Sequence, residues 1–373
     1  MSAGPASDGS ADDVGSGAGT ADRPSVLVVY SVRNLAKIER HVGPLTEAAD
    51  VTMVCIDADE SVDGVDYVTV PDFGVRPVGL VLMALAAFVE AWRGDYDAVA
   101  SFSLLPNGCI ALAVGALFGL PTHLGIIGID LDVHVEARYG AVVRALIRRF
   151  DAVSVPGTAF RDRLLELGVA EDRATILVNP IDVGTYHPVE RDPEFDLLWV
   201  GRFESEKDPL TFLAALDELA DRGRSFNAVL AGDGPLHPVV ERAVRERALA
   251  DRVDLVGWVD DPADYYRRAG AFVLTSERDA LPLSLVEAMA TGLPSVVPAV
   301  GNVPDVARDG ETALVADDRT PAAFADALDR LLGDDDLRER LGANAGNVSE
   351  RYSYDAATDD WCDVLVTMDV VER

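Results

Sequence analysis

The sequence predicts an α/β protein with two domains, each built on a parallel β-sheet, that face each other across a cleft. Short, continuous apolar runs of strand length alternate with helical segments along most of the chain, a pattern typical of βαβ units. This alternation breaks once, in the proline-containing segment 179–195, and then restarts. The length of 373 residues suits about two domains of ordinary size.

The first predicted domain covers residues 25–180. Its expected strands are residues 25–30, 51–56, 98–102, 123–129, 152–155 and 175–179, and its expected helices are residues 78–92, 106–118, 139–150 and 158–167. The longest apolar stretches, 78–89 and 108–120, are shorter than the roughly 20 residues that a membrane span needs, so we expect buried helices there. Residues 1–24 are small, polar and acidic, and we predict a disordered tail.

The second predicted domain covers residues 196–350 and follows a linker at residues 181–195. Its expected strands are residues 196–200, 226–231, 253–256, 271–275 and 295–298, and its expected helices are residues 209–221, 283–290, 321–332 and 336–348, with a further helix that begins at His237. A last helix near residues 354–370, within the segment 351–373, is expected to pack back on the first domain. Both domains are therefore predicted to be Rossmann-like, and such sheets bind ligands at the carboxyl ends of their strands.

The charge of the chain is extreme, because 64 Asp and Glu residues face only 32 Lys and Arg residues and the net charge is −32. Such a field repels nucleic acid, so a nucleic-acid partner is not expected. Only Lys37 and Lys207 are lysines. A dense shell of carboxylates keeps a protein soluble where salt screens charge, and we interpret the composition as that of a cytoplasmic halophilic protein. The three scattered cysteines predict neither a disulfide scaffold nor a zinc site.

The first candidate binding motif follows the strand that ends at Val200. Gly201 permits a tight exit from that strand, and Arg202 and Lys207 stand before the next helix. Two cations at the top of a strand suit a pyrophosphate. The alternative is that Arg202 pairs with Glu204 or Glu206 at the surface.

Two more loops follow later strands. The turn Gly232-Asp233-Gly234 allows close approach of a ligand to the backbone, or it is a simple strand-to-helix turn. In the segment 276–290, the N–H groups of Leu283 and Ser284 are expected to be free at a helix start, where they and the helix dipole attract phosphate. Asp279 in the loop and Glu287 in the helix are the carboxylates of this segment, and a carboxylate there suits a ribose diol. The alternatives are a loop or capping role for Asp279 and a surface position for Glu287.

These segments together resemble the retaining glycosyltransferases of family 4, which have the GT-B fold, and the composition suggests the haloarchaeal type. The resemblance covers most of the chain after the tail and is sharpest from Leu197 to Val300. It rests on five pieces in order, which read VGRFESEKD, AGDGPL, VGWVDD, SERDALPLSLVEAMATGLPSVV and RYSYDAATDDW.

The resemblance implies a role for each matching residue. Arg202 and Lys207 neutralise the diphosphate of a nucleotide sugar, helped by the amides of Leu283 and Ser284, and Glu287 holds the ribose hydroxyls. Val259 and Asp261 line the nucleobase. Asp279 replaces the first glutamate of the family's E-x7-E motif, near the transferred sugar, and Ala280 replaces the glycine that usually follows.

The first half departs further from the family pattern. The loop 31–36 lacks the usual glycines, and Ile127 occupies the position of a histidine in the motif that ends at Asp130. Asp130 itself matches and is a candidate catalytic residue. His134 is either a replacement imidazole or a structural histidine. The segment that starts at Asn179 has Pro180 where the family has glycine.

The resemblance implies transfer of a sugar, most simply a hexose, with retention at the anomeric carbon. The leaving nucleoside diphosphate gains charge, which Arg202, Lys207 and the helix N-terminus stabilise in the transition state. No second carboxylate is evident as a nucleophile, so the acceptor hydroxyl is expected to attack the face that the phosphate leaves. Since two cations and a helix dipole are available, we predict metal independence, with no metal site and no cofactor.

The resemblance also implies a lipid-linked or surface glycan precursor as the acceptor. Arg138, Arg144, Arg148 and Arg149 cluster at one predicted helix and suit peripheral contact with the cytoplasmic membrane face. Ordinary surface arginines are the alternative. Two rival functions remain, namely an epimerase or phosphorylase relative of the same fold and a non-catalytic paralogue that binds a nucleotide sugar or a partner enzyme.

Overall fold

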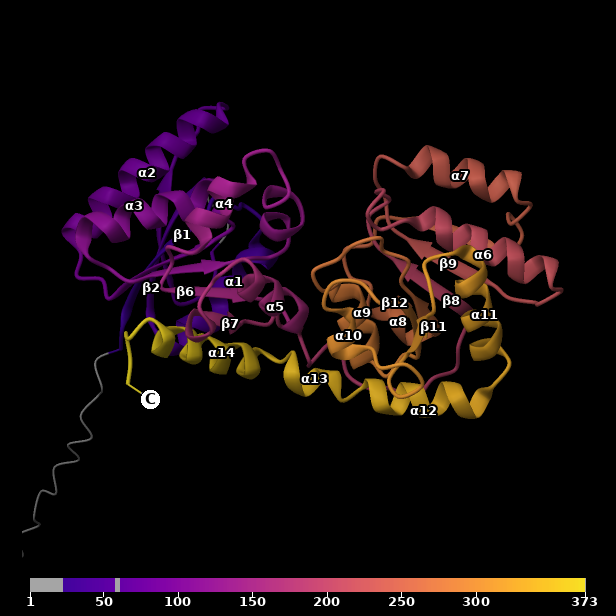
Figure 1. Cartoon of the computed structure of the whole chain (residues 1–373). Coiled ribbons are helices and arrows are strands. Elements are labelled where there is room, and N and C mark those ends of the chain that lie inside the picture. The colour runs from indigo at the N-terminus through magenta and orange to yellow at the C-terminus, as the bar shows by residue number, and fades with distance from the viewer. Residues whose placement is uncertain (1–22, 58–60, 373) are drawn as a thin grey trace, which may run out of the picture.

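The structure of the chain is a computed structural model that describes residues 23–57 and 61–372. Figure 1 shows two α/β domains side by side, each with helices packed against a central sheet. Within the described residues the first sheet has seven strands and the second has six, and every strand pairing is parallel. The prediction of two Rossmann-like domains with parallel sheets is confirmed. The predicted tail lies almost wholly outside the described residues.

The first sheet has the strand order β3-β2-β1-β4-β5-β6-β7. Its strands are β1 (Ser25–Val29), β2 (Asp50–Ile56), β3 (Val65–Val70), β4 (Ala98–Phe102), β5 (Thr122–Gly125), β6 (Ala152–Val155) and β7 (Ala174–Ile176). The helices around it are α1 (Leu35–Ala48), α2 (Arg76–Arg93), α3 (Cys109–Phe118), α4 (Gly140–Ile147) and α5 (Thr158–Glu166), with short turns η1 (Leu104–Gly108), η2 (Asp130–His134) and η3 (Glu171–Arg173). The central strands are buried on both faces, which explains their continuous apolar runs.

The second sheet has the strand order β10-β9-β8-β11-β12-β13. Its strands are β8 (Phe195–Val200), β9 (Ala228–Ala231), β10 (Val253–Gly257), β11 (Ala269–Val273), β12 (Ser295–Pro298) and β13 (Leu314–Ala316). The helices of the second half are α6 (Pro209–Asp221), α7 (His237–Glu246), α8 (Ala263–Arg268), α9 (Leu283–Ala290), α10 (Val303–Val306), α11 (Pro321–Leu332), α12 (Asp335–Ala345), α13 (Val348–Arg351) and α14 (Tyr354–Thr367).

Several elements differ from the expectation. The strand expected at 123–129 ends at Gly125, because the chain turns away from the sheet toward Gly128. The structure adds α1, β3, α8, α10 and β13, which the sequence pattern did not show. Strand β3 is an outer strand that is only partly buried, and α1 contains Pro44. Both features weaken the apolar periodicity on which the expectation rested.

Helix α2 is not the buried helix that we expected. Small or apolar residues four positions apart (Gly79, Met83, Ala87 and Ala91) are buried against the domain. The opposite face carries Val81, Leu85 and Trp92, which are 60%, 57% and 75% exposed. The apolar run therefore continues around the helix onto the surface. None of the described helices is both long enough and sufficiently apolar to cross a membrane.

Helix α14 lies along the first domain although it follows the second domain in the chain (Figure 1). It packs on α1, and Trp361 enters the core of the first domain, where its ring meets the edge of His123 at a centroid distance of 4.9 Å. The indole N–H of Trp361 donates to the carbonyl of His41 at 3.2 Å. The chain thus passes between the domains twice, before β8 and again before α14.

Candidate functional site

Two loops meet at the carboxyl ends of the neighbouring strands β8 and β11. The N–H of Glu277 donates to the carbonyl of Glu206 at 2.8 Å, and the Thr275 hydroxyl donates to the carbonyl of Asp208 at 2.8 Å. Arg319 also pairs with the Asp208 carboxylate at 2.9 Å. These contacts hold the turn that carries Lys207, at the sheet edge where α/β domains bind ligands.

Lys207 and Asp279 form an ion pair between these loops. The side chains are only 21% and 12% exposed, so each charge is largely withdrawn from water. Sequence analysis selected both residues for separate roles, and the structure brings them into contact. A partly buried pair of this kind places one cation and one carboxylate beside the same ligand space.

Arg202 adopts the surface pairing that was the alternative expectation. Its guanidinium contacts the carboxylates of Glu204 at 2.9 Å and Glu206 at 3.1 Å, and about half of its side chain is exposed. Arg278 also pairs with Glu206, at 3.2 Å. In this structure Arg202 therefore belongs to an exposed charge network at the edge of the site.

The glycines of the β8 and β9 loops are explained by contact between the two backbones. A Cβ atom on Gly232 would lie 1.9 Å from the carbonyl oxygen of Gly201. Gly234 has a φ of +153°, and a Cβ there would lie 2.7 Å from the carbonyl oxygen of Phe203. The turn Gly232-Asp233-Gly234 thus needs glycine for packing, as the simple-turn interpretation holds.

The start of α9 leaves backbone donors free. Pro282 precedes the helix and provides no side-chain cap. Within the described part of the chain, the N–H groups of Leu283 and Ser284 have no hydrogen-bond acceptor, whereas those of Leu285 and Val286 donate to Pro282. The geometry suits an anion, since free N–H groups and the helix dipole attract negative charge, and anion binding here stays a prediction.

Glu287 lies one turn further along α9, where it faces the boundary between the domains. The Tyr266 hydroxyl donates to its carboxylate at 3.1 Å. Burial raises the pKa of Glu287, while the positive charge of Arg40 on α1 and the Tyr266 hydrogen bond oppose the rise and Asp261 adds to it. Glu287 is therefore not a solvated surface residue. Sequence analysis missed Arg40 and Tyr266, since no motif marks either residue.

The two residues predicted to line the base lie in the loop after β10. Val259 is half-buried, and Asp261 is exposed. The Asp261 carboxylate accepts a hydrogen bond from the N–H of Ala263 at 3.0 Å, which caps the start of α8. Asp261 thus has a clear local role, and its charge also reaches Glu287.

On the first domain, Asp130 is completely buried, whereas sequence analysis expected a catalytic role for it. Its carboxylate accepts a hydrogen bond from the N–H of Leu104 at 3.1 Å, and burial raises its pKa. In this structure that contact gives Asp130 a structural role, and its catalytic role stays a prediction. His134 bonds to the Tyr139 hydroxyl at 2.7 Å, which matches the structural alternative for that histidine.

Asp132, which sequence analysis missed, reaches the domain boundary instead. Burial raises its pKa, the charges of Arg278 and Arg163 oppose the rise, and the charge of Asp279 adds to it. A Cβ on Gly128 would lie 3.4 Å from the Cβ of Ala280 in the second domain. The loop 128–132 therefore faces the Asp279 loop directly across the cleft.

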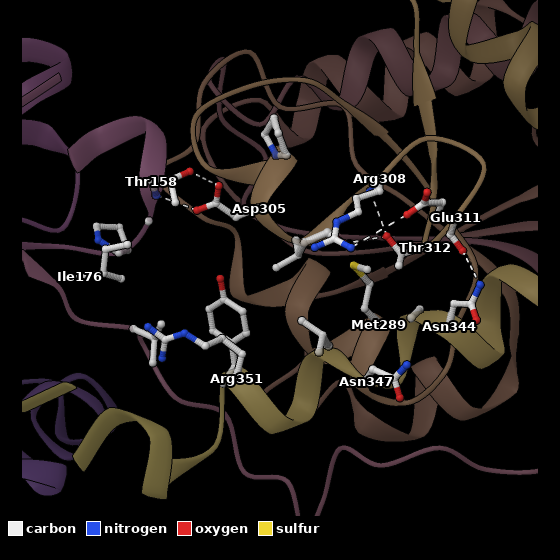
Figure 2. Close-up of a pocket in the computed structure, with 18 residues that line it drawn as sticks. Thr158, Ile176, Met289, Asp305, Arg308, Glu311, Thr312, Asn344, Asn347 and Arg351 are labelled. Atoms are coloured by element: carbon white, nitrogen blue, oxygen red, sulfur yellow. Dashed lines mark hydrogen bonds and ion pairs between the residues drawn. The ribbon is translucent and has the colours of Figure 1, made fainter. Parts of the chain in front are cut away.

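A cavity of about 790 Å³ lies elsewhere along the domain boundary. Figure 2 shows Thr158 and Asp305 on one side of it, Arg308 and Glu311 on the other, and Arg351 below. None of the predicted site residues lines this cavity. The cavity and the Lys207–Asp279 site are thus separate features of the same boundary.

Comparison with known proteins agrees with a division into two domains. The sequence profile described as "Glycosyl transferase 4-like domain" matches residues 38–180, and that described as "Glycosyl transferases group 1" matches residues 187–348. The D-inositol 3-phosphate glycosyltransferase of Frankia alni is 32% identical over 305 residues, which cover 70% of this chain and 72% of that protein. The chain belongs to the group 1 glycosyltransferases.

Other relatives match a shorter region. The alpha-D-kanosaminyltransferase of Streptomyces kanamyceticus is 35% identical over 166 residues, which are 44% of this chain and 43% of that protein. The chain thus spans about two fifths of the length of this relative, and 39% of the D-inositol 3-phosphate glycosyltransferase of Streptomyces bingchenggensis.

Solved structures share the GT-B fold. Anabaena HepE has a TM-score of 0.76 and 15% identity, with 92% of this chain and 100% of that chain covered. Sucrose-phosphate synthase from Thermosynechococcus elongatus has a TM-score of 0.75 and 18% identity, with 94% and 100% covered. At these identities the likeness establishes the fold, which is the one that the sequence predicted.

Proposed function

We propose that this protein is a retaining glycosyltransferase that moves a sugar, most simply a hexose, from a nucleoside-diphosphate sugar to a hydroxyl acceptor. The observation that carries the proposal is the Lys207–Asp279 pair at the carboxyl ends of β8 and β11, in the same loop region as the free N–H groups of α9. The names of relatives support the donor class, since HepE has been crystallised with UDP and with UDP-glucose.

In this proposal the cations and the start of α9 bind the diphosphate of the donor. Lys207 and the N–H groups of Leu283 and Ser284 stabilise the charge that grows on the leaving phosphate, so they bind the transition state more tightly than the donor. Arg202 joins this site by exchanging its exposed glutamate partners for phosphate. That exchange has a small cost, because exposed ion pairs contribute little stability.

Asp279 is assigned to the transferred sugar and Glu287 to the ribose. The Lys207 ammonium holds the shorter Asp279 side chain in place, which compensates for the methylene that it lacks relative to glutamate. The acceptor hydroxyl attacks the face from which the phosphate departs and passes its proton to that phosphate. Since Lys207 and the helix start supply positive charge at the diphosphate, we propose that the reaction needs neither a metal ion nor a cofactor.

The acceptor is assigned to the first domain, as a lipid-linked or surface glycan precursor in a halophilic cytoplasm. Arg138, Arg148 and Arg149 at α4 are exposed, and Arg144 bonds to the carbonyl of Val135. In the described part of this very acidic chain, none of the four has a carboxylate within 4.0 Å. Unpaired arginines and the apolar face of α2 together favour peripheral contact with an anionic lipid surface.

Donor binding tests this proposal. Thermal unfolding is followed in molar KCl with UDP-, GDP- and dTDP-sugars, and a ligand at 100 times its Kd should add about 2.7 kcal/mol of stability. We expect one donor class to stabilise the protein. The same donor should be consumed when acceptor is present, also in EDTA. NMR of the product should show that the anomeric configuration of the donor sugar is retained. Stabilisation without transfer or hydrolysis would favour the non-catalytic paralogue, and no stabilisation by any donor would contradict the proposal. Activity lost in EDTA and restored by Mg²⁺ would contradict metal independence.

A further inference from the structure

The start of helix α5 in the first domain is capped by side chains from the second domain. The Asp305 carboxylate accepts a hydrogen bond from the N–H of Thr158 at 2.7 Å and another from its hydroxyl, and both are drawn in Figure 2. The Asn302 side-chain oxygen accepts from the N–H of Phe160 at 3.0 Å. A helix normally satisfies these N–H groups with its own N-cap side chain. Here the N-cap is Gly157, and the cap comes from residues more than 140 positions away.

Gly157 is what allows the two domains to approach so closely. A Cβ at this position would lie 2.4 Å from a carboxylate oxygen of Asp305 and 2.6 Å from the Cβ of Asn302. Real Cβ atoms do not make contacts this short, so any larger residue would push the domains apart.

The same Asn302 side chain also binds the donor loop. Its NH₂ group donates to the carbonyl of Ala280 at 2.7 Å, and its backbone N–H donates to the same oxygen at 2.9 Å. Ala280 directly follows Asp279. Asn302 is completely buried, so a lost bond would leave polar groups without water.

We propose that Asn302 is a positioning residue that makes the placement of Asp279 depend on contact between the domains. This inference deepens the function proposed above and rests on it only for the role of Asp279. One amide group joins the N-terminus of α5 to the peptide after Asp279, so both bonds exist together only when the domains have the relation seen here. When the domains separate, Asn302 stays with the donor loop in the second domain but loses the hydrogen bond from Phe160, which is the contact that fixes the orientation of its amide group.

The test compares Asn302→Ala with a matched asparagine variant. Asn344 also belongs to the second domain, and its side chain donates to the carbonyl of Glu311 at 2.8 Å within that domain, so Asn344→Ala is the control. The first readout is amide hydrogen exchange in the protein without ligands. We expect at least tenfold faster exchange in residues 276–282 for Asn302→Ala and no change there for Asn344→Ala. This readout does not require that the protein be an enzyme.

The second readout is the kinetics of transfer per active site, with active sites counted by the stoichiometry of donor binding. We expect kcat to fall at least tenfold in Asn302→Ala while the donor Kd stays within about threefold. A merely structural role would lower the active fraction and leave kcat per active site unchanged.

Gly157→Ala provides a second test of the inference if Asn302→Ala does not fold. It separates the domains without altering Asn302 or Ala280, and we expect the same faster exchange in residues 276–282. Unchanged exchange in that segment, in either folded variant, would overturn the inference. Wild-type protein that neither binds donor nor transfers sugar would instead contradict the proposed function, and the exchange result would still decide the coupling.

Discussion

The two domains differ in how far their surface arginines are paired with carboxylates and in how many large apolar side chains they expose. In the second domain most surface arginines are matched with carboxylates, as Arg222 is with Asp326 at 2.7 Å and Arg247 with Asp217 at 2.6 Å. In the first domain the arginines of α4 have no such partners among the described residues, and most of the exposed large apolar side chains of the chain lie there.

This difference indicates that the surfaces of the two domains interact with different surroundings. A surface of paired charges interacts mainly with water and salt, and the candidate site of the second domain lies in its loops after β8 and β11. The unpaired cations and exposed apolar residues of the first domain remain available for another surface. The first domain, which has the weaker motif matches, therefore has the more distinctive exterior.

The largest expected effect concerns the second domain. Lys207→Ala removes the partly buried cation, and we expect transfer to fall by about 100- to 1000-fold, as for loss of one preorganised charge-stabilising donor. The measurement is kcat for transfer, together with the thermal shift by donor. Lys37→Ala is the matched control, because Lys37 is the other lysine and is exposed on α1. Equal activity of the two variants would remove Lys207 from the mechanism.

The next effect tests the first domain. Replacement of Arg144, Arg148 and Arg149 by Glu should reduce co-sedimentation with anionic liposomes by at least tenfold, because it reverses the charge of the α4 surface. Val81, Leu85 and Trp92 changed together to Ser should weaken binding as well, and more strongly in high salt, where only the apolar contribution persists.

The control for this experiment makes the same charge change on the other domain. Arg242 and Arg245 on α7 and Arg247 directly after it are replaced by Glu, and we expect liposome binding to stay within about twofold of the unmodified protein. If the α4 and α7 variants bind equally, the two exteriors do not differ in the way proposed.

The smallest effect is on stability and arises where α14 packs on the first domain. Burial lowers the pKa of His123 to about 3, and burial with the charges of Arg40 and Lys37 lowers the pKa of His41 to about 3. The unfolded chain binds these protons near pH 6.5 and the folded chain does not, so stability falls as the pH falls. Between pH 7 and pH 5 each histidine should cost about 2 kcal/mol of unfolding free energy.

Denaturant unfolding at pH 7 and pH 5 in molar KCl measures this loss. His123→Phe keeps an aromatic ring against Trp361 and removes one titrating group, so its loss between the two pH values should be smaller than that of the wild type. His187→Gln is the control, since His187 is exposed. A pH dependence unchanged by His123→Phe would contradict the assignment.

Much of the second domain could be predicted from the sequence. The segments around Lys207, Asp279 and Glu287 carry short motifs in which glycine, proline and charge mark strand ends and helix starts, and α6 and α9 begin and end where expected. Outer elements such as β3 were missed, since partial burial leaves little apolar periodicity.

Contacts between distant segments were not predictable in the same way. The roles of Arg40, Asp132 and Asn302 depend on the other domain, and no local pattern encodes a partner more than 100 residues away. The exposed face of α2 was missed for a related reason. An apolar run shows that a helix has apolar residues all round, and only the packing of its neighbours shows which of them are covered.

Local sequence was enough to determine the two parallel-sheet domains, the order of most of their elements and the loops that form the candidate site, because strand burial, helix starts and turns depend on neighbouring residues. The tertiary structure alone decided that Lys207 meets Asp279, that Asp130 is enclosed and that Asn302 joins the domains. Each of these outcomes depends on which groups lose water when distant surfaces come together, and desolvation is a property of the folded chain.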